Sequence, residues 1–131
     1  DEESKLRRAI RLINAYFNLS GHHCYSDEEM YQVGKLVDIP SSRFLRPFLK
    51  KLALLEGLRL RRIKRAMTYA AKNNKMFHLW WHPHNFGINQ DENFSFLTKI
   101  LEHYKELNHK YQFQSLNMLE LSALLQQKNG E

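Results

Sequence analysis

The residues most able to do chemistry lie in the segment 76–87, which holds three histidines and both tryptophans of the chain. There an apolar run of strand type, Met76–Trp81, ends in His82, His84 and Asn85. Histidine titrates near neutral pH and binds metals through its neutral ring, so it serves as general acid, general base or ligand. A buried strand that ends in such side chains is typical of one that delivers polar groups to a site.

Alternation along the predicted strand decides which of these side chains lie together. Successive side chains point to opposite faces, so His78, Trp80 and His82 share one face. Pro83 ends the regular strand. Ligands in α/β proteins bind at the carboxyl ends of parallel strands. We expect His82 and His84 to lie there, with His78 deeper in the core.

Three interpretations of the two terminal histidines stay open. The His-x-x-x-His and His-x-His spacings suit a metal ion, but the nearby carboxylates, Asp91 and Glu92, are assigned to a helix cap. A general acid or base, or a substrate-binding group, is a second interpretation for His82 or His84. In the third, the pair only bonds backbone groups at a tight turn.

Aromatic, arginine and amide side chains form the candidate substrate contacts. Trp80 and Trp81 point to opposite faces, so one is core and the other stacks on a sugar ring through its large apolar face; alternatively both are core. Arg43 and Arg46 could clamp a carboxylate or a sugar hydroxyl, or pair with acidic side chains instead. Asn85 adds an amide at the exit of the strand.

The net charge of +6 is concentrated in one place, since five cationic side chains fall within Arg59–Arg65. Such a cluster binds nucleic acid, an acidic glycan or an anionic membrane, and its simpler interpretation is a solvated helix face. Nucleic-acid binding is disfavoured, because Tyr69 and the other aromatic residues have the pattern of a buried face and do not alternate with the charges.

Apolar periodicity and capping signals predict a helix-rich α/β chain with few parallel strands. Strands are expected over 76–81 and 111–116, and they must be parallel if they are neighbours, because a helix separates them. Residues 1–74 are mainly helical, and residues 75–131 follow the order strand, helix, strand, helix. The expected helices are 4–17, 26–39, a short one that Gly57 ends after residue 55, 59–73, 89–109 and 117–125.

Length and composition bound the function. At 131 residues the chain is one domain. No apolar run approaches the ~20 residues of a membrane span. The lone Cys24 excludes an internal disulfide, and His22, His23 and Cys24 are expected to form an ordinary loop, since adjacent residues seldom converge on one ion. The acidic start, Asp1–Ser4, is no signal peptide, and it enters a helix so soon that we expect a cut within a longer protein.

The segment His78–Gly87, preceded by Arg59–Lys72, resembles the C-terminal part of bacterial polysaccharide deacetylases. These are carbohydrate esterases of the chitooligosaccharide deacetylase type. The runs Ser42–Pro47, Asn93–Tyr104 and Ser115–Glu120 fit the same family. The likeness covers nearly the whole chain, and the histidine motif is its most specific part.

The resemblance implies the C-terminal part of a distorted (β/α) barrel that removes acetyl groups from the N-acetyl sugars of a glycan. In that family an aspartate and two histidines hold a divalent metal, zinc by expectation, and a second aspartate is the base. These groups belong to the N-terminal half of the domain. This chain is therefore expected to supply no metal ligand and to be inactive alone, and the compartment, bacterial cytoplasm or envelope, stays open.

The resemblance also implies a role for the histidine motif. His82 occupies the place of the family's general acid, with His84 as second choice, although Trp80 stands where the family has leucine. His78-x-x-x-His82-Pro83 looks like the family's metal motif as well. We reject that assignment, because most of the barrel should follow a metal motif and only 49 residues follow His82.

Overall fold

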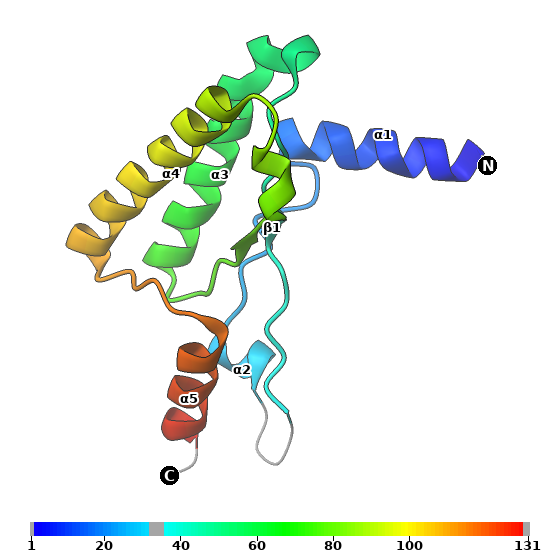
Figure 1. Cartoon of the computed structure of the whole chain (residues 1–131). Helices are drawn as coiled ribbons and strands as arrows, with labels where there is room; N and C mark the ends of the chain where they lie inside the picture. Colours follow the sequence, from blue (N-terminus) through cyan, green and yellow to red (C-terminus); the bar gives the residue numbers. More distant parts are fainter. Residues whose placement is uncertain (1, 32–35, 130–131) are drawn as a thin grey trace.

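The computed structural model describes residues 2–31 and 36–129, and helices predominate in this part of the chain (Figure 1). No helix in it is long and apolar enough to cross a membrane. The helix-rich α/β class is confirmed. The elements are α1 Glu2–Tyr16, α2 Asp27–Met30, β1 Arg43–Phe44, the 3₁₀ helix η1 Lys50–Leu55, α3 Glu56–Lys72, β2 Leu79–Trp80, the 3₁₀ helix η2 Pro83–Phe86, α4 Gln90–Tyr111 and α5 Met118–Asn129.

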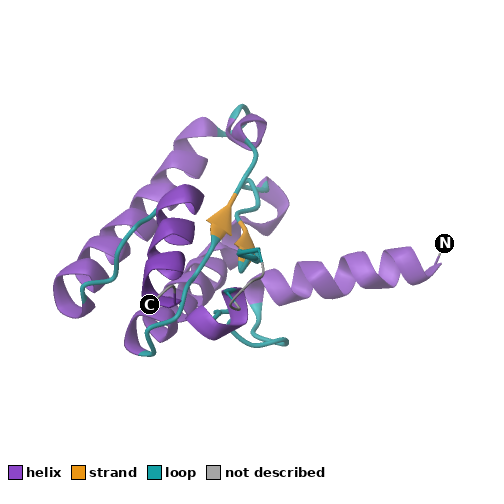
Figure 2. Ribbon diagram, turned by 90° about the horizontal axis from the view of Figure 1, so that it is seen from below, coloured by secondary structure: helices purple, strands orange, loops and turns teal. Residues whose placement is uncertain are grey.

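The two strands form a small parallel sheet, with Arg43 opposite Leu79 and Phe44 opposite Trp80. Since η1 and α3 connect them, the unit is a β-α-β crossover, the kind of connection that parallel strands require. Seen from below, the strands lie beside the helices of the body, and the N-terminal helix α1 extends away from them (Figure 2). The sequence offered 111–116 as the parallel neighbour of the strand 76–81, whereas the parallel partner of β2 is β1.

The core forms where α3 packs against α4. Along α3 the inward positions recur with helical spacing, and every residue predicted to face inward is buried: Ile63, Ala66, Met67 and Ala70. From α4 the cluster receives Phe96, Ile100 and Leu107, and from the segment after β1 it receives Leu45. The sheet therefore covers one side of a helix pair, and the helices determine where the strand ends lie.

Alternation gives the two faces of the sheet different surroundings. Leu45 is buried in the core cluster and Leu79 packs against that cluster, so their shared face is turned to α3 and α4. Phe44 and Trp80 occupy the opposite face, where their ring centroids lie 4.6 Å apart. Arg43 is an exception to this division of the two faces, because alternation places its charged side chain on the apolar core face.

The predicted strand 111–116 is wrong. Helix α4 runs to Tyr111, and Gln112 then takes a left-handed backbone with φ of 56° while its amide donates to the Asn108 carbonyl at 2.8 Å. This turn ends the helix, and Phe113 packs on Tyr104 of the same helix from an irregular segment, with ring centroids 6.5 Å apart. The apolar alternation of the segment thus reflects packing on α4 without strand pairing.

Other boundaries differ as well. Gly57 lies inside α3 and does not end the preceding helix. Helix α2 stops at Met30, and Leu36 is 94% exposed in an extended segment, so the second helix is much shorter than predicted; Val33 lies outside the described residues. The cap position Asn89 is correct, but its side chain makes no capping bond. The predicted strand 76–81 is reduced to β2 and one antiparallel bridge from Met76 to Tyr25.

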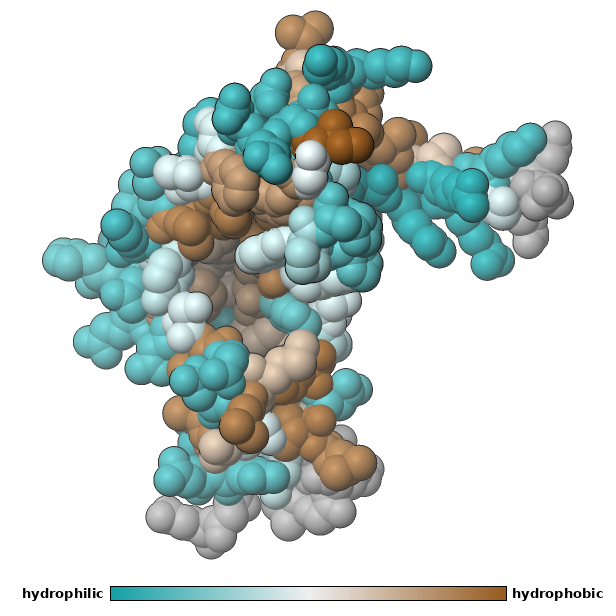
Figure 3. Space-filling model, viewed as in Figure 1, coloured by the Kyte–Doolittle hydropathy of each residue, from teal (hydrophilic) through white to brown (hydrophobic). Residues whose placement is uncertain are grey.

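Large apolar surfaces remain open in the described part of the chain. A groove of about 1200 Å³ lies between the α3–α4 pair and α5 and is lined by Met67, Leu97, Ile100 and Tyr104, among others. Figure 3 shows this hollowed, apolar face. Helix α1 projects from the body (Figure 1) and exposes an apolar stripe of Leu6, Ile10, Ile13 and Phe17.

Candidate active site

The histidine segment is held in place by a short turn directly after β2. His82 is extended, with φ of −90° and ψ of 136°, and Pro83 opens η2. Proline suits the first helical position, because its missing N–H has no acceptor there. The turn closes through the amide of Asn85, which donates to the His82 carbonyl at 2.9 Å, and that of Gly87, which donates to His84 at 3.1 Å. As predicted, the regular strand has ended before Pro83.

Four rings form a continuous row at the carboxyl ends of the two strands. Trp80 lies against Phe44 on one side and is perpendicular to the His82 ring on the other, at a centroid distance of 5.2 Å and an interplanar angle of 89°. His82 then stacks on His84, with centroids 5.1 Å apart and planes 13° apart. Both imidazoles are exposed. The structure therefore brings Trp80, His82 and His84 together on one open face, as the alternation predicts.

His78 has a separate, structural role. Its ring Nδ1 lies 3.3 Å from the Pro40 carbonyl and its amide donates to the Ser42 hydroxyl at 2.9 Å. Its carbonyl accepts from the amides of Ser42 and Arg43, both at 3.0 Å. These bonds join the starts of the two strands. The expectation that His78 lies deeper and is hydrogen-bonded is confirmed.

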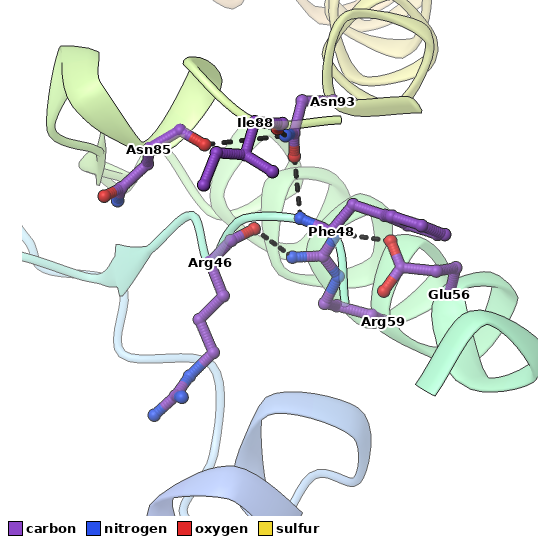
Figure 4. A network of polar contacts seen from close by, with 7 residues as sticks. All are labelled: Arg46, Phe48, Glu56, Arg59, Asn85, Ile88 and Asn93. Atoms are coloured by element: carbon purple, nitrogen blue, oxygen red, sulfur yellow. Dashed lines mark hydrogen bonds and ion pairs between the residues drawn. The ribbon is translucent and has the colours of Figure 1, made fainter. Parts of the chain in front are cut away.

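The two candidate arginines do not join the row of rings. Arg43 lies on the core face of the sheet and donates from Nη1 to the Asn14 carbonyl at 3.5 Å. The side chain of Arg46 points away from the polar network around Asn93 (Figure 4), and only its backbone carbonyl joins that network, by accepting from Arg59. Neither arginine pairs with an acidic side chain among the described residues, which was the alternative interpretation of both.

Asn85 and Trp81 flank the row. The Asn85 side chain points away from Asn93 (Figure 4), and its Nδ2 is buried without a hydrogen-bond partner in the described part of the chain. Trp81 is 39% exposed, contacts Phe86 and lines the apolar groove, whereas Trp80 is half-buried. Neither tryptophan is a fully buried core residue. Trp81 therefore belongs to the lining of the groove, and Trp80 is the indole that contacts the imidazole pair.

Asn93 positions the site, and sequence reasoning missed it. This residue of α4 is 3% exposed. Its Oδ1 accepts from the Phe48 amide at 2.7 Å, and its Nδ2 donates to the Ile88 carbonyl at 2.8 Å and to that of Asn85 at 3.5 Å (Figure 4). One side chain therefore ties the loop after β1 to the turn after β2. Because its partners are backbone atoms, no residue pattern points to it.

The basic cluster divides between buried and exposed positions. Arg59 is 3% exposed, pairs with Glu56 and lies over the Phe96 ring at 4.0 Å, and Arg62 is 5% exposed. Arg61 and Arg65 are exposed. The cluster is therefore not a fully solvated helix face, which was one expectation. It is also not a surface of five exposed charges, which binding of nucleic acid or an acidic glycan would use.

Among the described residues, no group of three or more histidine, cysteine, aspartate or glutamate side chains could hold a metal ion. His78 and His82 have the spacing of a metal motif, but their rings have separate partners. The His78 ring lies next to the Pro40 carbonyl, and the His82 ring lies between Trp80 and His84. No protein-family model, curated protein or solved structure matches the chain.

Proposed function

We propose that the chain is the C-terminal part of a metal-dependent polysaccharide N-deacetylase with a distorted (β/α) barrel, in which His82 is the general acid. The observation that carries this proposal is the row of rings at the carboxyl ends of parallel strands, in which half-buried Phe44 and Trp80 lead to the exposed His82 and His84. Ligand sites of α/β proteins lie at these ends. The resemblance of the histidine motif to these deacetylases agrees with it.

His82 has the position and chemistry of a proton donor. A protonated imidazole can give its proton to the leaving amine as the tetrahedral intermediate collapses. The perpendicular contact with Trp80 and the stacking contact with His84 restrain its ring plane, so the donating nitrogen would have a defined direction. A positioned acid requires such restraint, since proton transfer needs hydrogen-bond distance to the substrate.

The groups around His82 suit a sugar. Trp80 and Phe44 present ring surface on which the apolar face of a pyranose could stack. The buried Nδ2 of Asn85 is an unused donor, which a hydroxyl or acetamido oxygen of the substrate could accept. The substrate class of this proposal is therefore an N-acetylated glycan. Arg43 takes no part, because alternation places it on the other face of the sheet.

The open surfaces support a larger barrel. A two-stranded sheet over a helix pair leaves the apolar groove and the stripe on α1 in contact with water. Surfaces of this kind are interaction surfaces. In the proposal, further strands of the same domain cover them. In the proposal, the rest of the domain also supplies the divalent metal, zinc by expectation, and the base.

The test is acetate release by a protein that carries this chain and the remaining barrel strands, loaded with zinc and given N-acetylated glycans. We expect His82→Ala to lower turnover by about 10²-fold or more. His109→Ala is the matched control, because His109 is exposed near the end of α4, away from the row of rings.

The outcomes separate the parts of the proposal. If no N-acetylated glycan yields acetate, the deacetylase function is refuted. If His84→Ala abolishes turnover while His82→Ala leaves it unchanged, the acid is His84. The alternative of a basic module that binds nucleic acid or an acidic glycan through Arg59–Arg65 gains no support, since Arg59 and Arg62 are buried.

A further inference from the structure

Four cationic or imidazole side chains converge on the far side of the sheet from the row of rings. Arg43 comes from β1 and Arg62 from α3, while His22 and His23 belong to the loop between α1 and α2. The last turns of α1 close this region, because the Asn14 carbonyl accepts from Arg43. None of the four has an acidic partner among the described residues, so positive charge accumulates there without compensation.

Arg62 is the most deeply buried member. It is 5% exposed, and its Nη2 donates to the Gly21 carbonyl at 3.4 Å. Its Nη1 is buried and has no hydrogen-bond partner in the described part of the chain. An unpaired buried donor is unfavourable, and more so when it is charged. This cost is removed when a further group accepts a hydrogen bond from the Arg62 Nη1.

Arg43 also has a buried donor without a hydrogen-bond partner among the described residues. Its Nη1 makes one long bond to Asn14, and its Nε is buried without a partner among the described residues. Burial lowers the pKa of Arg43, and burial together with the charge of Arg43 lowers the pKa of Arg62 to about 10. Both side chains remain charged at pH 7. Two fixed positive charges therefore lie close enough to act on each other.

The neighbouring loop adds an imidazole that is held in place through Ser20. Asn14 donates from Nδ2 to the Ser20 hydroxyl at 2.7 Å, and the Ser20 oxygen lies 2.7 Å from Nε2 of His23. The Ser20 oxygen has a second lone pair as well as one hydrogen, so it can accept from Nε2 or donate to it, and either tautomer of the neutral His23 ring fits this contact. Burial first, and then Arg43 and Arg62, lower the pKa of His23, which favours this neutral form.

We propose that Arg43, Arg62 and His23 form a binding site for a phosphate group. The phosphate group carries close to two negative charges near neutral pH, which matches two arginines, whereas a carboxylate would neutralise only one. Guanidinium N–H groups bind phosphate oxygens with favourable geometry, and the two unpaired donors would gain acceptors. The site lies on the core face of the sheet and does not depend on the deacetylase proposal.

The test is titration of the full chain with inorganic phosphate at low ionic strength, followed by calorimetry and by the NMR signal of the Arg43 Nε–H. We expect saturable binding that shifts this signal, because phosphate becomes its acceptor. Arg62→Met and Arg43→Met should each weaken binding about tenfold or more, the loss of one charge-assisted hydrogen bond. Arg61→Met, an exposed neighbour on α3, is the matched control and should bind like the wild type.

Two further arms make the outcome decisive. Glucose 6-phosphate binding more tightly than inorganic phosphate would identify a phosphorylated ligand, and equal or weaker binding would identify the free ion; both agree with the site. If Arg62→Met does not fold, Arg43→Met and the Nε–H signal decide. Absence of binding at millimolar phosphate, or an equal loss in Arg61→Met, would overturn the proposal, since the latter indicates diffuse surface attraction.

Discussion

Removal of the Asn93 side chain should destabilise the fold by more than any exposed polar substitution on the same helix. Asn93→Ala leaves the Phe48 amide without its acceptor at 2.7 Å and the Ile88 carbonyl without its donor at 2.8 Å. Each unpaired backbone group that is shielded from water costs about 1–3 kcal/mol. Because both loops are half-open to solvent, we use the lower part of this range and expect a loss of about 2–4 kcal/mol.

The measurement is urea denaturation followed by circular dichroism, with Asn108→Ala as the matched control. Asn108 is an exposed asparagine of the same helix that donates one bond, to the Phe113 carbonyl at 3.0 Å. Its loss should cost about 0.5–1 kcal/mol, the net value of one hydrogen bond. The comparison separates burial of the amide from helix propensity, since both positions lie in α4 and change from asparagine to alanine.

Hydrogen exchange gives a second, local readout. In the wild type the Phe48 amide is held by Asn93, so it should exchange slowly, and in Asn93→Ala it should exchange faster than amides in the centre of α3. Equal urea midpoints for Asn93→Ala and Asn108→Ala, or an unchanged exchange rate for Phe48, would refute the claim that this side chain joins the two loops. The result would also test whether the turn that carries His82 and His84 depends on α4.

Two other predictions follow from burial. Burial raises the pKa of Cys24 to about 11, so iodoacetamide at pH 8 should alkylate it at least about tenfold more slowly in the folded chain than in urea. Because the unfolded thiol ionises first, the free energy of unfolding should fall between pH 9 and about 11, and Cys24→Ala should reduce that fall. Ile63→Ala, at a position 1% exposed, should cost about 2–5 kcal/mol in urea denaturation. Ile88→Ala, 75% exposed, should change stability by less than about 0.5 kcal/mol.

The sequence predicted those elements that depend on local signals. Helix α5 begins where Asn117 and Glu120 form their capping box, with the Glu120 carboxylate accepting from the Asn117 amide at 2.8 Å and the Asn117 side chain accepting from the Glu120 amide at 2.9 Å. The inward face of α3 follows its 3.6-residue period. Strand partners were not predictable in this way, because pairing of β2 with β1 depends on a crossover of more than thirty residues.

Sequence reasoning predicted the part of the candidate site that residues close together in the sequence form. His82, His84 and Trp80 lie together because alternation along one strand and one short turn brings them there. Arg43 shows the limit of such reasoning. Its side chain direction depends on the register of β1 against β2, and a shift by one residue would turn it to the face of His82. The sequence contains no sign of that register.

Register also explains how one small sheet could carry the two proposed sites. Phe44 and Trp80 fall on one face, which stays open, and the row continues to the imidazoles of His82 and His84. Arg43 falls on the other face, which α1 and α3 close. A one-residue insertion between His78 and Leu79, where β2 begins, would exchange the faces of β2 while leaving β1 unchanged. Such a variant should lose the Trp80–Phe44 contact and the order of the histidines, whereas the phosphate group proposed for Arg43 and Arg62 should still bind.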